Sequence, residues 1–286
     1  MHARSALFTL FGDIVRPAGG EAWLTALTGA MGALGFTPQA TRTALSRMTA
    51  EGWVAPRRAG RYAAYGLTPR GVDRLEEAAA RIYRLSAAPW DGQWRLLLPP
   101  PAVDADAELA RTLSWMGFGP LCPGVWVSPS DHGTRLNALP GLADADHLVA
   151  RRDLLGPGAP GGLAAQDRRV AERAWDLGAL RAAHAQFLER WGKPGEGGSP
   201  SDADPRAAFV DRILLVHHWR SFLFLDPGLP AELLPGDWLG TDAAARFAER
   251  HEALAAASWA WWDQLTAPTP AALLVARTPD PIREKP

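Results

Sequence analysis

A polar-faced helix followed at once by an arginine-rich hairpin is the feature that most constrains this chain. The pair Thr37-Pro38 predicts a helix over 38–51, because threonine caps a helix N-terminus and proline fits its first position. Ala44, Leu45 and Met48 then share one side of this helix, together with Ala40. We therefore expect that side to pack against neighbouring helices and the opposite side to be polar and exposed.

The residues on either side of this helix complete a larger pattern. Two amphipathic stretches, 6–15 and 21–34, predict two helices before it, each ended by glycine or proline. After it, Val54–Arg58 and Tyr62–Leu67 predict two strands, joined by a tight turn at 59–61. This order of elements is typical of a winged helix-turn-helix, in which the third helix enters a DNA groove and the hairpin forms the wing.

The residue types on the third helix suit base recognition. Arginine can hold guanine, glutamine can hold adenine, and hydroxyl groups reach bases or phosphates. Every surface helix has a polar face, so the helix alone does not establish this role; the arginine hairpin beside it favours it. We expect base contacts from Gln39, Arg42, Thr43, Ser46 and Arg47. We expect contacts to the DNA backbone from Thr37, Arg57, Arg58, Arg61 and Tyr62.

The charge of the chain is unevenly distributed. Residues 1–89 contain eleven arginines and six acidic residues, whereas the remaining residues carry an excess of acid and the whole chain has a net charge of −1. A basic first segment on an acidic remainder indicates that the first segment is the part that meets a polyanion. Double-stranded operator DNA is the partner that we expect for it.

Composition excludes several other classes of protein. No apolar run is long enough for a transmembrane helix, and the N-terminus lacks the pattern of a signal peptide, so we expect no membrane association and a cytoplasmic location. The single cysteine, Cys122, allows no internal disulfide and no thiolate metal site. We expect four parts: 1–88, 89–163, the almost entirely helical 164–267, and a flexible tail over 268–286.

Catalytic motifs are absent from the sequence. Gly156, Gly158 and Gly161 match the spacing of a dinucleotide-binding loop, but Pro157 and Pro160 remove amides that such a loop needs. This run is therefore interpreted as a linker between domains. We expect no catalytic residue, no metal site and no cofactor.

Short blocks spread along the chain are similar to those of the PaaX-type repressors of phenylacetic acid degradation. They are Leu7–Asp13, Arg42–Met48, Glu51–Trp53, Ile82-Tyr83, Trp90–Arg95, Gly117–Gly119, Pro123–Pro129, His217–Arg220, Leu225–Pro230 and Leu234–Trp238. The resemblance implies an α+β fold with a ferredoxin-like (βαββαβ-type) middle domain and a helical C-terminal domain. It also implies a homodimeric repressor that an aryl-CoA or other acyl-CoA thioester, such as phenylacetyl-CoA, releases from its operator.

A small-molecule effector of this kind needs cations for its phosphates and apolar rings for its acyl group. Arg212, His217 and Arg220 lie in an otherwise apolar helical tract, and Trp126 and Trp219 are candidates for the acyl group. Core packing is the competing interpretation of these tryptophans. Packing of one histidine beside an exposed one is the competing interpretation of His217 and His218.

Four functional alternatives remain open at this point. The chain could be an activator or a regulator that senses a free aromatic acid, or an architectural protein without a ligand. A ferredoxin-like domain also raises the alternative of a metal-dependent nuclease, which needs an acidic residue at the end of its first strand. Here the predicted strand Trp94–Leu98 runs into three prolines, and Asp91 precedes it.

Overall fold

The computed structural model describes residues 1–60, 62–82, 90–100, 106–133, 136, 139, 142, 144–151, 162–193, 195–196 and 204–267. The chain is α+β, with helices and two antiparallel sheets. It divides into two compact units. The first unit collects the described residues within 1–83, 190–220 and 244–286, and the second collects those within 84–189 and 221–243.

The first unit begins with the helices predicted from the sequence, with two differences. Helix α1 spans Ala3–Leu10 and continues as a π-helix over Phe11–Val15. The stretch predicted as a helix over 21–34 instead forms strand β1 (Glu21–Trp23) and helix α2 (Leu24–Ala33). Its first three residues become a strand because they pair with Ala64–Gly66, a segment that lies far along the chain.

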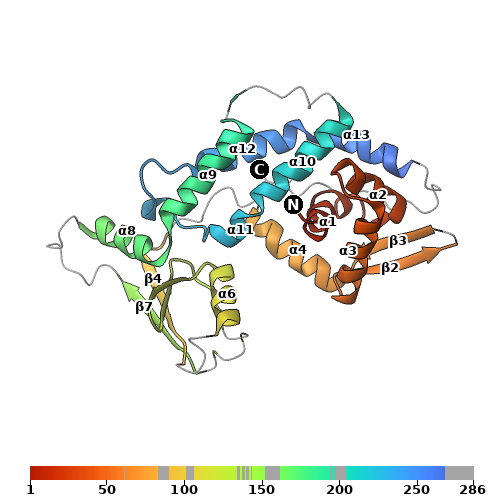
Figure 1. Cartoon of the computed structure of the whole chain (residues 1–286). Coiled ribbons are helices and arrows are strands. Elements are labelled where there is room, and N and C mark those ends of the chain that lie inside the picture. The colour runs from red at the N-terminus through yellow and green to blue at the C-terminus, as the bar shows by residue number, and fades with distance from the viewer. Residues whose placement is uncertain are drawn as a thin grey trace. The chain divides into compact units, whose positions relative to one another are not determined.

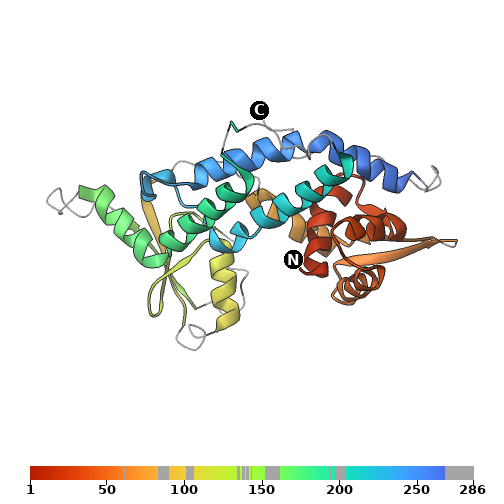
Figure 2. The ribbon, with the colours of Figure 1, turned by 45° about the horizontal axis from the view of Figure 1, so that its top comes forward.

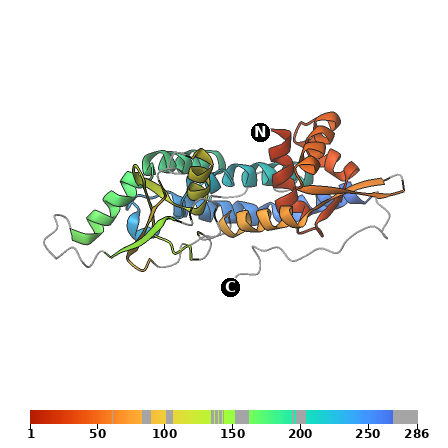
Figure 3. The ribbon, with the colours of Figure 1, turned by 90° about the horizontal axis from the view of Figure 1, so that it is seen from below.

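The hairpin that follows helix α3 (Pro38–Ala50) has the predicted strands. Strands β2 (Val54–Ala59) and β3 (Tyr62–Leu67) pair along their whole length, and the sheet order is β1-β3-β2. The turn contains Gly60 with a φ of 57°, a left-handed conformation that glycine adopts without strain. Thr68 then caps helix α4 (Pro69–Ile82) by accepting a hydrogen bond from the amide of Gly71. The hairpin extends away from α1, α2 and α3 (Figures 1 and 3).

The core of the first unit joins the N-terminal helices to helices from the end of the chain. Helices α10 (Pro205–Trp219) and α13 (Ala255–Thr266) lie side by side (Figure 2). Phe209, Ile213 and Trp262 from these helices are buried in the same cluster as Leu7, Leu27, Leu45 and other residues of α1–α3. Burial of large apolar side chains stabilises a fold by roughly 1.5–3 kcal/mol each, so this shared cluster holds the unit together.

The second unit is built on a sheet with the order β5-β6-β4-β7. The strands are β4 (Gln93–Leu98), β5 (Gly119–Cys122), β6 (Val125–Ser128) and β7 (Asp146–Arg151), and the predicted strand Trp94–Leu98 is confirmed as β4. Trp94 packs in a cluster with Ala171 of helix α8 (Gly162–Ala174), whereas Leu97 packs with Leu113 of helix α6 (Ala107–Met116). Neighbouring side chains of a strand point to opposite faces, so β4 serves two separate clusters.

The remaining elements of the second unit are α11 (Phe222–Leu225), a 3-10 helix over Ala231–Leu233 and most of helix α9 (Leu177–Trp191). Helix α12 (Gly240–Ala253) belongs mainly to the first unit. The spatial grouping thus differs from the sequential division at residues 88 and 163, which stays a prediction. The predicted linker at 156–161 and the tail over 268–286 lie outside the described residues.

Candidate nucleic-acid interface

Helix α3 presents its polar residues as the sequence predicts. The hydroxyl of Thr37 accepts a hydrogen bond of 3.1 Å from the amide of Ala40, and Pro38 occupies the first turn. Thr41, Ala44, Leu45 and Met48 are buried against the unit. The five residues predicted to contact bases are all exposed: Gln39, Arg42, Thr43, Ser46 and Arg47.

The two arginines on this face keep their charge available. Within the part of the chain that the structure describes, Arg42 and Arg47 form no ion pair or hydrogen bond through their side chains. Glu51, at the end of the helix, is held by Arg4 and by the Trp53 indole, whose Nε1 donates a 2.8 Å hydrogen bond to it. This neighbouring acid is therefore neutralised, and the exposed face keeps a net positive charge that suits phosphates.

The predicted backbone-contact residues of the β2–β3 hairpin differ in how far they are already bound. Arg58 is exposed and, among the described residues, forms no ion pair. Arg57 is instead bound to Glu21 through two hydrogen bonds of 2.7 Å, which raise the pKa of its guanidinium. Tyr62 is half-buried, with its ring 5.9 Å from that of Trp23, and Arg61 lies outside the described residues. Contacts from these residues to the DNA backbone stay predictions.

The residues predicted to bind an effector are only partly brought together. Arg212, His217 and Trp219 lie on α10, and Arg220 ends that helix, so these four belong to the first unit. Trp126 lies on β6 in the second unit and is 8% exposed. Trp219 is 8% exposed as well, and its ring stacks on Phe247 at 4.9 Å. Both tryptophans therefore contribute to cores, as the competing interpretation expects.

Arg212 is the most deeply buried of these candidates, and it belongs to an ionic cluster that sequence reasoning missed. Its Nε donates to Asp13 Oδ2 at 2.7 Å and its Nη2 to Asp13 Oδ1 at 3.2 Å. His251 Nε2 lies 2.7 Å from Asp13 Oδ1. Burial alone would raise the pKa of Asp13, but the charges of Arg212 and His251 and their hydrogen bonds hold it well below its usual value. We call Asp13, Arg212 and His251 the buried ionic cluster.

This cluster connects three elements that are distant in the sequence. Asp13 lies in the π-helix, Arg212 on α10 and His251 on α12. An acidic residue between Phe11 and Ile14, in a segment that is otherwise apolar, was the only signal of a buried partner. Nothing in the sequence indicated which cation, because the partners lie 199 and 238 residues away.

Arg220 binds helix α1, and His217 lies three residues before it on α10. Arg220 Nη1 donates to the carbonyl of Ser5 at 3.0 Å and to the Thr9 hydroxyl at 2.9 Å, and burial lowers the pKa of this guanidinium. Burial, with smaller contributions from the charges of Arg220, the N-terminus and His218, lowers the pKa of His217 to about 4. His217 is therefore neutral at pH 7. Its role and that of Arg220 in binding an effector stay predictions.

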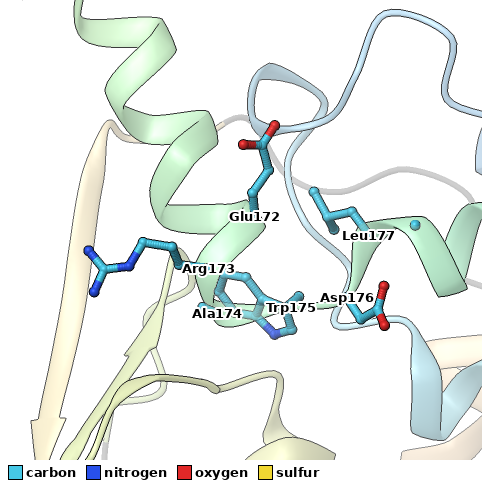
Figure 4. Close-up of a pocket in the computed structure, with 7 residues that line it drawn as sticks. Glu172, Arg173, Ala174, Trp175, Asp176 and Leu177 are labelled. Atoms are coloured by element: carbon cyan, nitrogen blue, oxygen red, sulfur yellow. The ribbon is translucent and has the colours of Figure 1, made fainter.

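A shallow pocket of about 410 Å³ lies in the second unit, where α8 meets α9 (Figure 4). Glu172 and Arg173 point in different directions from the end of α8. The Nε1 of Trp175 is buried without a hydrogen-bond partner among the described residues. None of the predicted effector residues lines this pocket, which is formed by Glu172, Arg173, Ala174, Trp175, Asp176, Leu177 and Gly178.

The residues that bear on the nuclease alternative are occupied by structural contacts. Asp91 forms an ion pair with Arg95, whose hydrogen bond to it holds the pKa of the carboxyl below its usual value. Strand β4 ends at Leu98, directly before Pro99. Across the described ranges, no group of three or more histidine, cysteine, aspartate or glutamate residues is placed to hold a metal ion.

No helix in the described part is long and apolar enough to cross a membrane.

Comparison with known proteins assigns the chain to a class of transcriptional regulators. Three family models match it in order: "PaaX-like protein" over residues 2–71, "PaaX protein central Cas2-like domain" over 87–150 and "PaaX-like protein C-terminal domain" over 175–264. The chain therefore belongs to the PaaX family.

Two relatives support this assignment. The transcriptional repressor PaaX of Escherichia coli is 33% identical over 244 residues, which cover 84% of this chain and 76% of the relative. Among solved structures, the uncharacterized protein Rv0674 from Mycobacterium tuberculosis is similar with a TM-score of 0.59 and 26% identity. That similarity covers 93% of this chain and 99% of the other.

Proposed function

We propose that this chain is a DNA-binding transcriptional repressor that reads its operator with helix α3. The observation that carries the proposal is the exposed polar face of α3, on which Arg42 and Arg47 have no partner within the described residues. Arginine and glutamine on such a helix can form paired hydrogen bonds to guanine and adenine in the major groove. Membership of the PaaX family and the E. coli relative named as a transcriptional repressor support the same role.

The first unit would bind DNA as a winged helix-turn-helix, with the β2–β3 hairpin as its wing. The order α1, α2, α3, β2, β3 supports this assignment, and β1 completes a small sheet beside the helices. The order β5-β6-β4-β7 in the second unit, together with the match to a Cas2-like domain, supports a ferredoxin-like arrangement there. A homodimer would place two copies of α3 on a near-palindromic operator, about one helical turn apart.

An aryl-CoA or other acyl-CoA thioester, phenylacetyl-CoA being the first candidate, would release the repressor. Family membership is what supports this part of the proposal. A ligand shifts an equilibrium only by its difference in affinity for the two states, so the thioester must bind the free protein more tightly than the DNA-bound protein. Phosphates need cations, which Arg220 at the end of α10 would supply, and the neutral His217 and the ring of Trp219 lie on the same helix.

Gel shift and fluorescence anisotropy on DNA from upstream of the chain's own gene test the first part of the proposal. Arg42→Ala is expected to lower specific affinity by about 1–3 kcal/mol, or roughly 5-fold to 150-fold. Arg169→Ala removes an equal charge from an exposed position on α8 and serves as the matched control. Equal affinities of both variants for the operator would contradict readout by α3.

The same DNA tests the effector. Phenylacetyl-CoA is expected to release the bound protein, and free phenylacetate at the same concentration is expected to leave it bound. Release by both compounds would indicate a sensor of the free acid. Retention with both would remove the thioester from the proposal while leaving DNA recognition by α3 intact.

A further inference from the structure

Four residues connect the wing to strand β1, and we call Glu21, Trp23, Arg57 and Tyr62 the wing clamp. Glu21 Oε1 accepts a hydrogen bond from Arg57 Nε, and its Oε2 accepts one from Arg57 Nη2, both at 2.7 Å. The Arg57 guanidinium also lies 5.4 Å from the centre of the Trp23 ring. The Tyr62 ring meets that of Trp23 edge to face at 5.9 Å.

The clamp lies where the sheet narrows from three strands to two. Strand β1 pairs with β3 only as far as Trp23 and Ala64, and Ala64 in turn pairs with Arg57 of β2. Beyond this row, the pairs Arg58–Ala63 and Ala59–Tyr62 form a two-stranded ribbon. A two-stranded hairpin is only marginally stable by itself, so side-chain contacts at this row decide how firmly the tip is held.

The charge of Arg57 is already neutralised in the free protein. Its bidentate pair with Glu21 is the strong geometry for an arginine and a carboxylate, and the Glu21 side chain is 19% exposed. The Arg57 side chain is 47% exposed and keeps N–H groups that Glu21 does not use, but a phosphate bound there would lie close to the Glu21 carboxylate, which opposes it. Arg58 is the next residue of β2, is exposed and, within the described part of the wing, has no acidic partner.

We propose that Glu21 and Arg57 are positioning residues that hold the wing in place, and that Arg58 supplies the phosphate contact. This inference rests on the proposed DNA-binding function, and it changes the role expected for Arg57. It also predicts that an acidic residue, Glu21, contributes favourably to binding of a polyanion. A surface that bound DNA by charge alone would gain from the loss of such a residue.

The test compares single variants with a charge-exchanged pair in the full chain. Affinity for DNA is measured as a function of salt concentration for Arg57→Ala, Arg58→Ala, Arg57→Glu and the double variant Glu21→Arg/Arg57→Glu. Hydrogen exchange of the free proteins, read by mass spectrometry over residues 54–67, reports on the wing without DNA. Thermal melting shows that each variant is folded.

We expect Arg57→Ala to weaken binding about fivefold and to leave the slope of log affinity against log salt unchanged. Arg58→Ala is expected to reduce that slope by about 0.9, the change for one lost phosphate contact. The exchanged pair restores the ion pair, so its affinity and the slow exchange of the wing are expected to return close to wild type. Arg57→Glu alone is expected to bind DNA more weakly than the wild type and to exchange faster in the wing.

Two results would overturn the inference. One is a reduction of the salt slope by Arg57→Ala equal to that caused by Arg58→Ala. The other is wing exchange in the free protein that is identical in the wild type, Arg57→Ala and Arg57→Glu. These outcomes are distinguishable from failure of the proposed DNA binding. If that proposal is wrong, the wild type itself forms no specific complex with DNA, whereas hydrogen exchange still tests the clamp because it needs no DNA.

Discussion

Removing the carboxylate of Asp13 is the most informative perturbation of this molecule. The substitution Asp13→Ala deletes both hydrogen bonds to Arg212 and the one to His251, and Arg212 is 0% exposed in the wild type. A buried ion pair that loses one partner destabilises a protein by about 3–5 kcal/mol, because an uncompensated charge stays buried. Typical domains are stable by only about 5–15 kcal/mol, so this loss is a large fraction of the total.

Urea denaturation followed by circular dichroism measures this loss. The matched control is Asp73→Ala on α4, where the side chain is exposed and forms no ion pair among the described residues. The control is expected to change stability by less than about 0.5 kcal/mol. If Asp13→Ala cannot be purified in folded form, the stability of the triple variant Asp13→Leu/Arg212→Met/His251→Leu is measured instead. Apolar replacement of all three partners is expected to recover most of the loss.

The effect of pH follows from the lowered pKa of Asp13. A carboxyl whose pKa is lower in the folded state contributes stability above its unfolded pKa of 3.8, and that contribution is lost as the pH falls below this value. The difference between wild type and Asp13→Ala is therefore expected to be complete at pH 7 and to narrow below pH 4. A loss of stability under about 1 kcal/mol at pH 7, or a stability difference between the two proteins that does not change with pH, would refute the reasoning.

Three further predictions concern the cap of α3, its polar face and a buried histidine. Thr37→Ala is expected to lower stability by about 1 kcal/mol because the amide of Ala40 loses its acceptor; in urea denaturation, an equal loss for Thr43→Ala, on the same helix, would contradict this. Arg47→Ala is expected to weaken binding to operator DNA in fluorescence anisotropy while leaving the melting temperature unchanged. A fall in melting temperature of several degrees would instead indicate a structural role. Burial lowers the pKa of His184 to about 4, so the unfolded state binds the proton more readily, and stability is expected to fall as the pH drops from about 6.5 to 4. His184→Phe should flatten this dependence in urea denaturation at several pH values, and His147→Phe, at an exposed position of β7, should not.

The buried ionic cluster and Arg220 both connect the first helix to helices from later in the chain. Asp13 directly continues α1, and Arg212 and His251 come from helices near the end of the chain. Arg220 binds the carbonyl of Ser5 and the hydroxyl of Thr9 in the same region. A ligand that competed for Arg220 would therefore act on helix α1 through contacts inside the first unit, the unit proposed to bind DNA.

The elements themselves were largely predictable from the sequence. The cap at Thr37, the glycine turn between β2 and β3 and the short apolar run of β4 depend on interactions within a few residues, and such interactions are readable in the local pattern. The exposed face of α3 followed from the same periodicity. Strand β1 was missed because its partner in β3 lies about forty residues further along the chain.

The sequence by itself thus predicted the first three helices, the β2–β3 hairpin, strand β4 and the side of α3 that faces outward. The tertiary structure alone decided which cations remain available. Arg42, Arg47 and Arg58 keep their charges exposed, whereas Arg57 is paired with Glu21 and Arg212 with Asp13. The physical reason is that an arginine's role depends on its burial and on the nearest carboxylate in space. Both are set by how distant segments pack, and no local pattern encodes them.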